Sequence, residues 1–390
     1  MGTKRILGSL SFLILLAFTP VHIYGAEAPK VRGISKDKVK VGAYQPLAGI
    51  LAASAKDVVN GAQAYFTHVN DQGGVNGRKV EYLTENDNYE PQQAVAVARK
   101  LVERDQIFAM VSPMGSATGM AVRRYLIQQK VPLVGPISPV PELAEPKESL
   151  IFGMMPVSAR SAHATVDWAL EALKPKRVAI FFQNDLFGKE SKDVTEQDLK
   201  KAGVDVVAVE GYLVTDTDVS ATVLKIKATN PDTVFFWSLP KHTAMFLKEA
   251  QKQGWKVNWV GPSMVADPET GRLAGDAVNG LKMVIYTALP ESTDPLMVEK
   301  VQIIKKYAPE TKLGYYSFIG MLGAMLFTEG LKNTGPNPTT ESFIKGMEII
   351  KDFKTGLVSP ITYSPGQHWR PPRYATAEWR AGNMVMIKSW

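Results

Sequence analysis

The stretch from Ile107 to Tyr125, IFAMVSPMGSATGMAVRRY, constrains the fold more than any other part of the sequence. Its first five residues are all apolar, which is typical of a strand covered on both faces. The turn formers Ser112, Pro113 and Gly115 end that run, and a helical pattern starts at Ser116. A strand, a tight turn and a helix in this order leave backbone N–H groups at the carboxyl edge of a sheet, where they favour a carboxylate.

Ser116 has two possible roles at this helix start. Its hydroxyl can cap the helix as the N-cap residue, or it can contact a ligand beyond the edge of the sheet. The sequence leaves both roles open, because one serine can serve in both.

After a polar linker at residues 27–38, strands and helices alternate as far as residue 134. This order predicts a parallel sheet wound with right-handed crossovers. The expected elements are strand 39–43, helix 56–69, strand 79–85, helix 91–104, strand 107–111, helix 116–129 and strand 131–134.

The alternation then starts again and predicts a second α/β lobe of similar size. Its expected elements are helix 159–173, strand 177–182, helix 189–201, strand 204–210, helix 218–229, strand 233–237, helix 240–253, strand 257–260 and strand 281–288. Three helices (295–307, 317–332 and 340–350) and two tail strands (373–379 and 384–387) complete the chain. Two such lobes form a cleft, which is a favoured place for a ligand and closes around it.

The first 25 residues have the pattern of a secretory signal peptide. Lys4 and Arg5 precede an apolar run that Pro20 breaks, and small residues follow at Gly25 and Ala26. The run is too short for a stable membrane-spanning helix. We expect cleavage near Gly25, and the sequence has no cysteine there for a lipid anchor. The protein is therefore expected in the periplasm of a Gram-negative bacterium, without a membrane anchor.

Composition and charge exclude several other classes of function. The sequence holds no cysteine, which rules out a disulfide framework and thiol chemistry. The formal net charge is +7, but lysines and arginines are scattered among acidic residues without a basic run. We therefore expect no nucleic-acid partner, and we expect a monomer.

A search for catalytic motifs predicts no enzyme. The five histidines (His22, His68, His163, His242 and His368) lack metal-ligand spacing, and the phosphate-loop and nucleophile-elbow motifs do not occur. Glu85 and Asp87 follow one strand and can form either an acid pair or a hydrogen-bond network that closes the loop, and the network is the expected role. No cofactor and no metal is expected.

Short motifs spread over nearly the whole chain resemble the leucine/isoleucine/valine-binding protein family, the periplasmic receptors of branched-chain amino-acid ABC transporters. In the first lobe they are residues 60–62 (NGA), 70–78 (NDQGGVNGR), 91–94 (PQQA) and 98–102 (ARKLV). In the second lobe they are residues 174–179 (KPKRVA), 187–189 (FGK), 216–220 (DTDVS), 230–232 (NPD), 260–262 (VGP) and 274–276 (AGD).

The resemblance implies the type I periplasmic-binding fold, an α/β architecture of two doubly wound parallel-sheet lobes. Lobe 1 would comprise residues 27–157 and 287–361, and lobe 2 residues 158–286 and 362–390. Three crossover strands would join the lobes as a hinge, with the ligand cleft between them.

The resemblance also implies which residues bind the ligand. The serine that holds the ligand carboxylate in the family corresponds to Ser116. The next ligand loop corresponds to Ile137, Ser138 and Pro139, where proline replaces a threonine and supplies neither an N–H nor a hydroxyl.

The residues expected in the second lobe depart further from the family. The carboxylate that pairs with the ligand ammonium in the family corresponds to Ser263, and two tyrosines correspond to Phe187 and Leu239. A buried ammonium without an anionic partner costs several kcal/mol, roughly. We therefore expect a ligand with a carboxylate and an apolar body but no free α-ammonium, such as an aromatic or branched aliphatic acid.

Other residues complete the expected site. Arg160 opens a helix after the first crossover and can hold the acid group, although a solvated arginine is the alternative. The remaining candidates for the cleft wall, each of which can equally be core, are Tyr44, Met114, Ala117, Trp237, Tyr315 and Tyr316.

The sequence thus predicts a periplasmic solute-binding protein that delivers a small organic acid to an inner-membrane permease and ATPase. Branched-chain amino-acid binding and transport is the alternative ligand assignment. A ligand-sensing domain of a signalling receptor is the alternative in another class, since the same fold serves both. A hydrolase that uses Ser116 is a third possibility.

Overall fold

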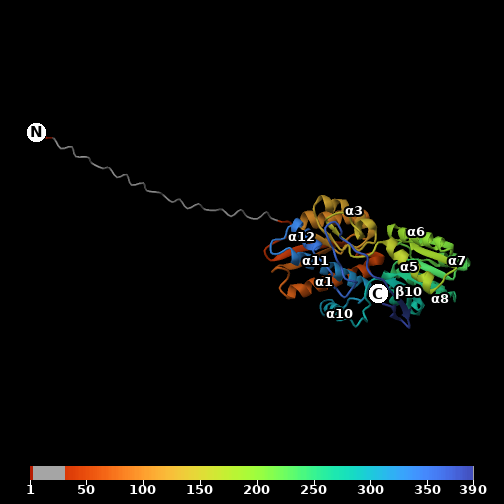
Figure 1. The fold of residues 1–390 in the computed structure, drawn as a ribbon. Coiled ribbons are helices and arrows are strands. Elements are labelled where there is room, and N and C mark those ends of the chain that lie inside the picture. The colour runs from red at the N-terminus through yellow and green to blue at the C-terminus, as the bar shows by residue number, and fades with distance from the viewer. Residues whose placement is uncertain (3–30, 390) are drawn as a thin grey trace. The chain divides into compact units, whose positions relative to one another are not determined.

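The computed structural model describes residues 1–2 and 31–389 (Figure 1). Residues 3–25 of the expected signal peptide lie outside the described residues. The fold lies within the unit Val31–Trp390. Within the described residues, no helix has the length and apolar character needed to cross a bilayer.

A five-stranded parallel sheet organises the first part of the fold, in the order β2-β1-β3-β4-β5. Its strands are β1 (Lys38–Gln45), β2 (Lys79–Asn86), β3 (Ala109–Val111), β4 (Leu133–Val134) and β5 (Ile151–Phe152). The parallel sheet and its first four strands were expected, with β3 and β4 each two residues shorter than predicted. β5 was not expected, because two residues give no period to detect.

Seven helices pack around this sheet. They are α1 (Ala52–Asp71), α2 (Pro91–Arg99), α3 (Ser116–Gln128), α4 (Pro141–Ala144), α10 (Pro295–Tyr307), α11 (Tyr315–Asn333) and α12 (Thr340–Glu348). α1 lies against α10 and α11 (Figure 1). α2 lies against α3. Gly61 and Gly320 allow α1 and α11 to approach closely, since a Cβ at either would collide with the backbone of the other helix.

A seven-stranded sheet organises the second part, in the order β12-β11-β10-β9-β8-β6-β7. Its strands are β6 (Arg177–Gln183), β7 (Asp205–Tyr212), β8 (Thr233–Trp237), β9 (Asn258–Pro262), β10 (Leu281–Ile285), β11 (Ala375–Arg380) and β12 (Asn383–Lys388). β11 and β12 run antiparallel at one edge, joined by a turn in which Ala381 and Gly382 both have positive φ. The two tail strands therefore form an antiparallel hairpin, which makes this sheet mixed instead of fully parallel.

Helices cover both faces of the seven-stranded sheet. They are α5 (Ser158–Ala172), α6 (Leu186–Lys201), α7 (Ser220–Ala228), α8 (Pro240–Lys252) and α9 (Pro268–Ala274). Successive residues of β6 enter two different cores: Val178 and Ile180 pack in one, and Ala179 and Phe181 in the other. Because side chains alternate across a strand, both faces are buried, which explains the apolar run in β6.

The chain passes between the two sheets three times: after β5, after β10 and before β11. This topology matches the two-lobe α/β fold that was expected. The residue ranges of the lobes stay a prediction. Four short helical turns lie between the larger elements: η1 (Gly49–Leu51), η2 (Lys100–Arg104), η3 (Ser263–Val265) and η4 (Gly275–Val278).

Candidate functional site

The site begins at the turn between β3 and α3. Ser112 has φ 53°, and its hydroxyl donates to the carbonyl oxygen of Gly320 at 3.1 Å. Gly115 has φ 125°, and a Cβ there would collide with Thr118 and lie 2.9 Å from the Tyr89 ring. The turn therefore requires glycine at position 115 on both backbone and steric grounds.

Gly115 and not Ser116 occupies the N-cap position of α3, which corrects one of the two roles expected for Ser116. No side chain caps this helix, and Ser116 is its first residue. The first N–H groups of a helix have no partner within it, and they carry the positive end of its dipole. The Ser116 hydroxyl is thus free of capping and lies beside N–H groups suited to an anion.

The loop after β4 lies next to this turn. Ile137 N–H donates to the carbonyl of Pro113 at 2.8 Å, and Gly115 N–H donates to the carbonyl of Ile137 at 3.1 Å. Behind Ser116, the Ser138 hydroxyl donates to the Ser116 Oγ at 3.1 Å, and both side chains are buried. Because Ser116 accepts this bond, its own O–H remains able to donate to a ligand oxygen.

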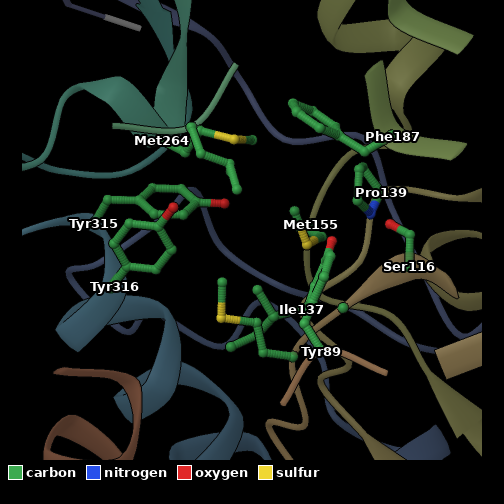
Figure 2. Close-up of a pocket in the computed structure, with 12 residues that line it drawn as sticks. Tyr89, Ser116, Ile137, Pro139, Met155, Phe187, Met264, Tyr315 and Tyr316 are labelled. Carbon is green, nitrogen blue, oxygen red and sulfur yellow. The ribbon is translucent and has the colours of Figure 1, made fainter. Parts of the chain in front are cut away.

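A cavity lies at these two loops, with about 410 Å³ of empty space, some of it open to solvent. Figure 2 shows Tyr315 and Tyr316 across the cavity from Ser116 and Pro139. The residues that line it are Tyr89, Met114, Gly115, Ser116, Ile137, Pro139, Met155, Phe187, Leu239, Met264, Tyr315 and Tyr316. None of these lining residues is charged, so the cavity is apolar with a few hydroxyl groups.

Three tyrosines supply most of those hydroxyls. Tyr315 OH and Tyr286 OH are 2.6 Å apart, and Tyr89 OH donates to the Asp185 carboxylate at 3.5 Å. Tyr316 OH is buried without a hydrogen-bond partner among the described residues. Burial raises the pKa of Tyr89, Tyr315 and Tyr316 well above its usual range. The three hydroxyls are therefore neutral, and that of Tyr316 is available to a ligand.

The cavity brings together most of the residues expected from the sequence. Ser138 supports Ser116 from behind, and Trp237 and Ser263 line an adjoining inner cavity. Those that line the main cavity are Met114, Ser116, Ile137, Pro139, Phe187, Leu239, Tyr315 and Tyr316.

Besides Ser138, three expected residues lie outside both cavities. Tyr44 is 1% exposed in the core, and Ala117 sits in the first turn of α3 without lining the cavity. Arg160 ion-pairs with Glu145 and lies over the Trp369 ring at 4.8 Å. The guanidinium is therefore held by a carboxylate and an indole instead of pointing into the cavity.

Tyr89, Met155 and Met264 line the cavity and were not expected from the sequence. Tyr89 has φ 62°, and its N–H donates to the Asp87 carboxylate at 3.0 Å in the loop after β2. Burial raises the pKa of Asp87 to about 6. Glu85 instead pairs with Lys100, so Glu85 and Asp87 form no acid pair and Asp87 closes the loop. A polar loop at the carboxyl end of a strand was the signal that could have pointed to Tyr89.

The four histidines among the described residues lie apart from the cavity. His68 contacts Gln72, His163 pairs with Asp198, His242 contacts the Asp216 carbonyl, and His368 contacts Glu348. Among residues 31–389, no group of three or more metal-ligating side chains could hold a metal ion.

Comparison with known proteins places this chain in a family. The sequence profile of the periplasmic binding protein family matches residues 38–383. The chain is 26% identical over 347 residues to the Leu/Ile/Val/Thr-binding protein of Salmonella typhimurium, covering 88% of this chain and 92% of that protein. It is 24% identical over 348 residues to a Leu/Ile/Val-binding protein of Rhizobium johnstonii, covering 89% and 93%.

Solved structures share the fold. A periplasmic substrate-binding protein from Ralstonia solanacearum superimposes with a TM-score of 0.82 at 23% identity, covering 90% of this chain and 99% of that one. A solute-binding protein from R. palustris in complex with benzoate gives a TM-score of 0.81 at 18% identity, covering 90% and 96%. The fold is therefore that of type I periplasmic binding proteins, as the sequence predicted. The chain belongs to the periplasmic binding protein family, and it is similar to the Leu/Ile/Val-binding proteins among its members.

Proposed function

We propose that this protein binds a small carboxylate with an apolar body in the periplasm and delivers it to a membrane permease and ATPase. The observation that carries the proposal is the start of α3 at the cavity wall. There the Ser116 hydroxyl and uncapped helix N–H groups face a space whose other walls are apolar. Hydrogen bonds to the carboxylate and burial of the apolar body together supply affinity.

The same cavity favours an acid without a free α-ammonium. A buried ammonium needs a carboxylate partner, and no residue that lines the cavity in the described chain is acidic. Phe187 and Leu239 present apolar side chains, and Ser263 lines the inner cavity with a neutral hydroxyl. The R. palustris protein, by its description, holds benzoate, and the Salmonella relative is a Leu/Ile/Val/Thr-binding protein. We propose an aromatic or branched aliphatic acid over an amino acid.

Residues from both sheets meet at the cavity, which supports closure around the ligand. Ser116 and Ile137 follow strands of the first sheet, and Phe187 and Leu239 follow strands of the second. A ligand that contacts both sides stabilises the closed arrangement over an open one, because the open one offers half of the contacts.

Calorimetry with matched acids tests this proposal. We would compare 4-methylpentanoate with leucine, and 3-phenylpropanoate with phenylalanine, because each pair differs in the α-ammonium. We expect each acid to bind at least tenfold more tightly than its amino acid. Tighter binding of leucine than of 4-methylpentanoate would overturn the ligand class while leaving the family assignment in place.

Substitution of Ser116 identifies the carboxylate site. Ser116→Ala removes a hydrogen bond to a charged group, worth about 1.5–3 kcal/mol, so we expect roughly a 10- to 100-fold loss of affinity for the acid. Ser220→Ala is the matched control, because Ser220 is likewise the first residue of a helix and lies outside the cavity. Equal affinities of the two variants for the acid would show that Ser116 does not bind the carboxylate.

A further inference from the structure

A second, inner cavity adjoins the main one. Its empty space of about 290 Å³ includes space open to solvent, and it shares the walls formed by Pro139, Met155, Phe187 and Met264. Two of the shared walls are methionines, whose flexible side chains can adjust to what passes between them. The inner cavity therefore continues the space in which the body of a bound ligand lies.

The buried polar side chains that line the inner cavity have partners within the protein, with one exception. The Trp237 indole N–H donates to Thr195 at 2.9 Å, and the Ser191 hydroxyl donates to the Phe187 carbonyl at 3.2 Å. Ser263 Oγ accepts from the Tyr286 N–H at 3.4 Å. These contacts leave the walls effectively apolar.

Ser158 is the exception. Its side chain is 1% exposed, and its Oγ has no hydrogen-bond partner among the described residues. Its backbone N–H donates to the Pro139 carbonyl at 2.8 Å, which fixes the residue against a wall shared by both cavities. Glu190 is the neighbouring acid: burial raises its pKa, and the Ser158 hydroxyl partly offsets that rise. A buried hydroxyl without a firm partner is costly and is usually satisfied by a ligand or an ordered water.

We propose that the inner cavity receives the far end of the ligand, and that this end carries a neutral hydrogen-bonding group bound by Ser158. This inference rests on the proposed function, which places the carboxylate at Ser116. No charged residue lines the inner cavity, and the neighbouring Glu190 disfavours an anion there, so the group proposed for the far end is neutral. The ligand class is thus an acid with an apolar body and a hydroxyl or carbonyl at the opposite end.

Matched acids with and without a terminal hydroxyl test the inference. The pairs are benzoate with 4-hydroxybenzoate, 3-phenylpropanoate with 3-(4-hydroxyphenyl)propanoate, and hexanoate with 6-hydroxyhexanoate. In the unaltered protein we expect the hydroxylated member of at least one pair to bind at least tenfold more tightly, by calorimetry. Ser158→Ala should abolish this preference and leave the affinity for the parent acid unchanged.

Two further variants separate this role from a structural one. Ser158→Thr keeps a hydroxyl and should keep the preference for the hydroxylated acid. Ser191→Ala alters the same cavity and should leave that preference unchanged. If parent acids bind but a terminal hydroxyl never strengthens binding, or if Ser158→Ala weakens both members of a pair equally, the inference is wrong and the proposed function stands. If no acid of any pair binds, the proposed function is wrong and the inference fails with it.

Discussion

The Asp267 carboxylate accepts a hydrogen bond from the backbone N–H of Tyr316, with Oδ2 and N 3.3 Å apart. The same carboxylate caps its own helix α9 by accepting from the Glu269 N–H at 3.0 Å. α9 packs with the seven-stranded sheet and α11 with the five-stranded one. One buried carboxylate therefore caps helices that belong to both parts of the fold, next to the cavity that Tyr316 lines.

Charged groups from three neighbouring segments surround this carboxylate. Asp57 of α1 accepts from the Lys312 N–H at 3.2 Å, and Glu269 pairs with Lys312 and with Arg272. Burial is the main cause that raises the pKa of Asp267 to about 7, and the neighbouring carboxylates add to it. Burial also raises the pKa of Asp57 to about 6.

The raised pKa of Asp267 predicts that stability falls as pH rises from 6 to 8. The folded state keeps a proton on Asp267 that the unfolded state, with an ordinary carboxyl pKa, has already lost. The stabilisation is fully present below the unfolded pKa and is lost as pH rises through about 7. One such group changes the free energy of unfolding by about 1 kcal/mol over this range. Urea denaturation at pH 6 and pH 8 measures the change.

The Asp267→Asn variant provides the control for this prediction. Asparagine keeps an oxygen that can accept from one N–H and does not titrate. We expect the difference between pH 6 and pH 8 to shrink to a small remainder. His242, whose pKa burial lowers to about 4, acts in the opposite direction, because its unfolded form still loses protons just above pH 6, and it offsets part of the change in this window. An unchanged difference in Asp267→Asn would assign the pH dependence to other groups.

The sequence predicted the fold well because alternating strands and helices of ordinary length carry strong periodic signals. The strand and helix pattern also predicted a site at the turn that contains Ser116, which follows a strand of a parallel sheet, whereas the loop at Ile137 was expected only from the family resemblance. It could not place Arg160, because the partner Glu145 lies in a different element and the pairing depends on how the chain crosses between the sheets.

The methionines and Tyr89 show a different limit of sequence reasoning. Met155 and Met264 are apolar residues that the sequence does not distinguish from ordinary core residues. Only the packing of the two sheets places them at a cavity. Tyr89 depends on a backbone with φ 62°, which tyrosine rarely adopts and which no sequence pattern indicates.

Gly115→Ala is expected to lower both stability and ligand affinity. A backbone with φ 125° is strained for alanine, and its Cβ would press on Thr118 and the Tyr89 ring. We expect a loss of about 1–3 kcal/mol in the free energy of unfolding and a loss of affinity because Ser116 shifts. Gly73→Ala is the matched control, with φ 97° and open space around its Cβ. It should lose stability but keep ligand affinity, and an equal loss of affinity in both variants would contradict the prediction.

Arg160→Gln is expected to leave the affinity for a carboxylate ligand within about threefold of the unaltered protein. Arg160 is occupied by Glu145 and Trp369, and it does not line the cavity. The exposed ion pair contributes about 0–1 kcal/mol, so stability should change little. Calorimetry with the acid that binds most tightly measures the effect. A loss of affinity greater than tenfold would show that Arg160 contributes to ligand binding.

Tyr89→Phe separates a contact between the two halves of the fold from a contact to the ligand. The Tyr89 hydroxyl donates to Asp185 at 3.5 Å, which is a long hydrogen bond, and Asp185 also accepts from Gln183 and from the Gly188 N–H. Removing the hydroxyl therefore leaves Asp185 satisfied and should weaken ligand binding by about twofold to fivefold, consistent with a bond worth at most about 1 kcal/mol. Tyr89→Ala removes the ring from the cavity wall as well and should cost at least roughly tenfold. If Tyr89→Phe alone lowers affinity as much as Tyr89→Ala does, the hydroxyl binds the ligand directly, and the contact to Asp185 is then secondary.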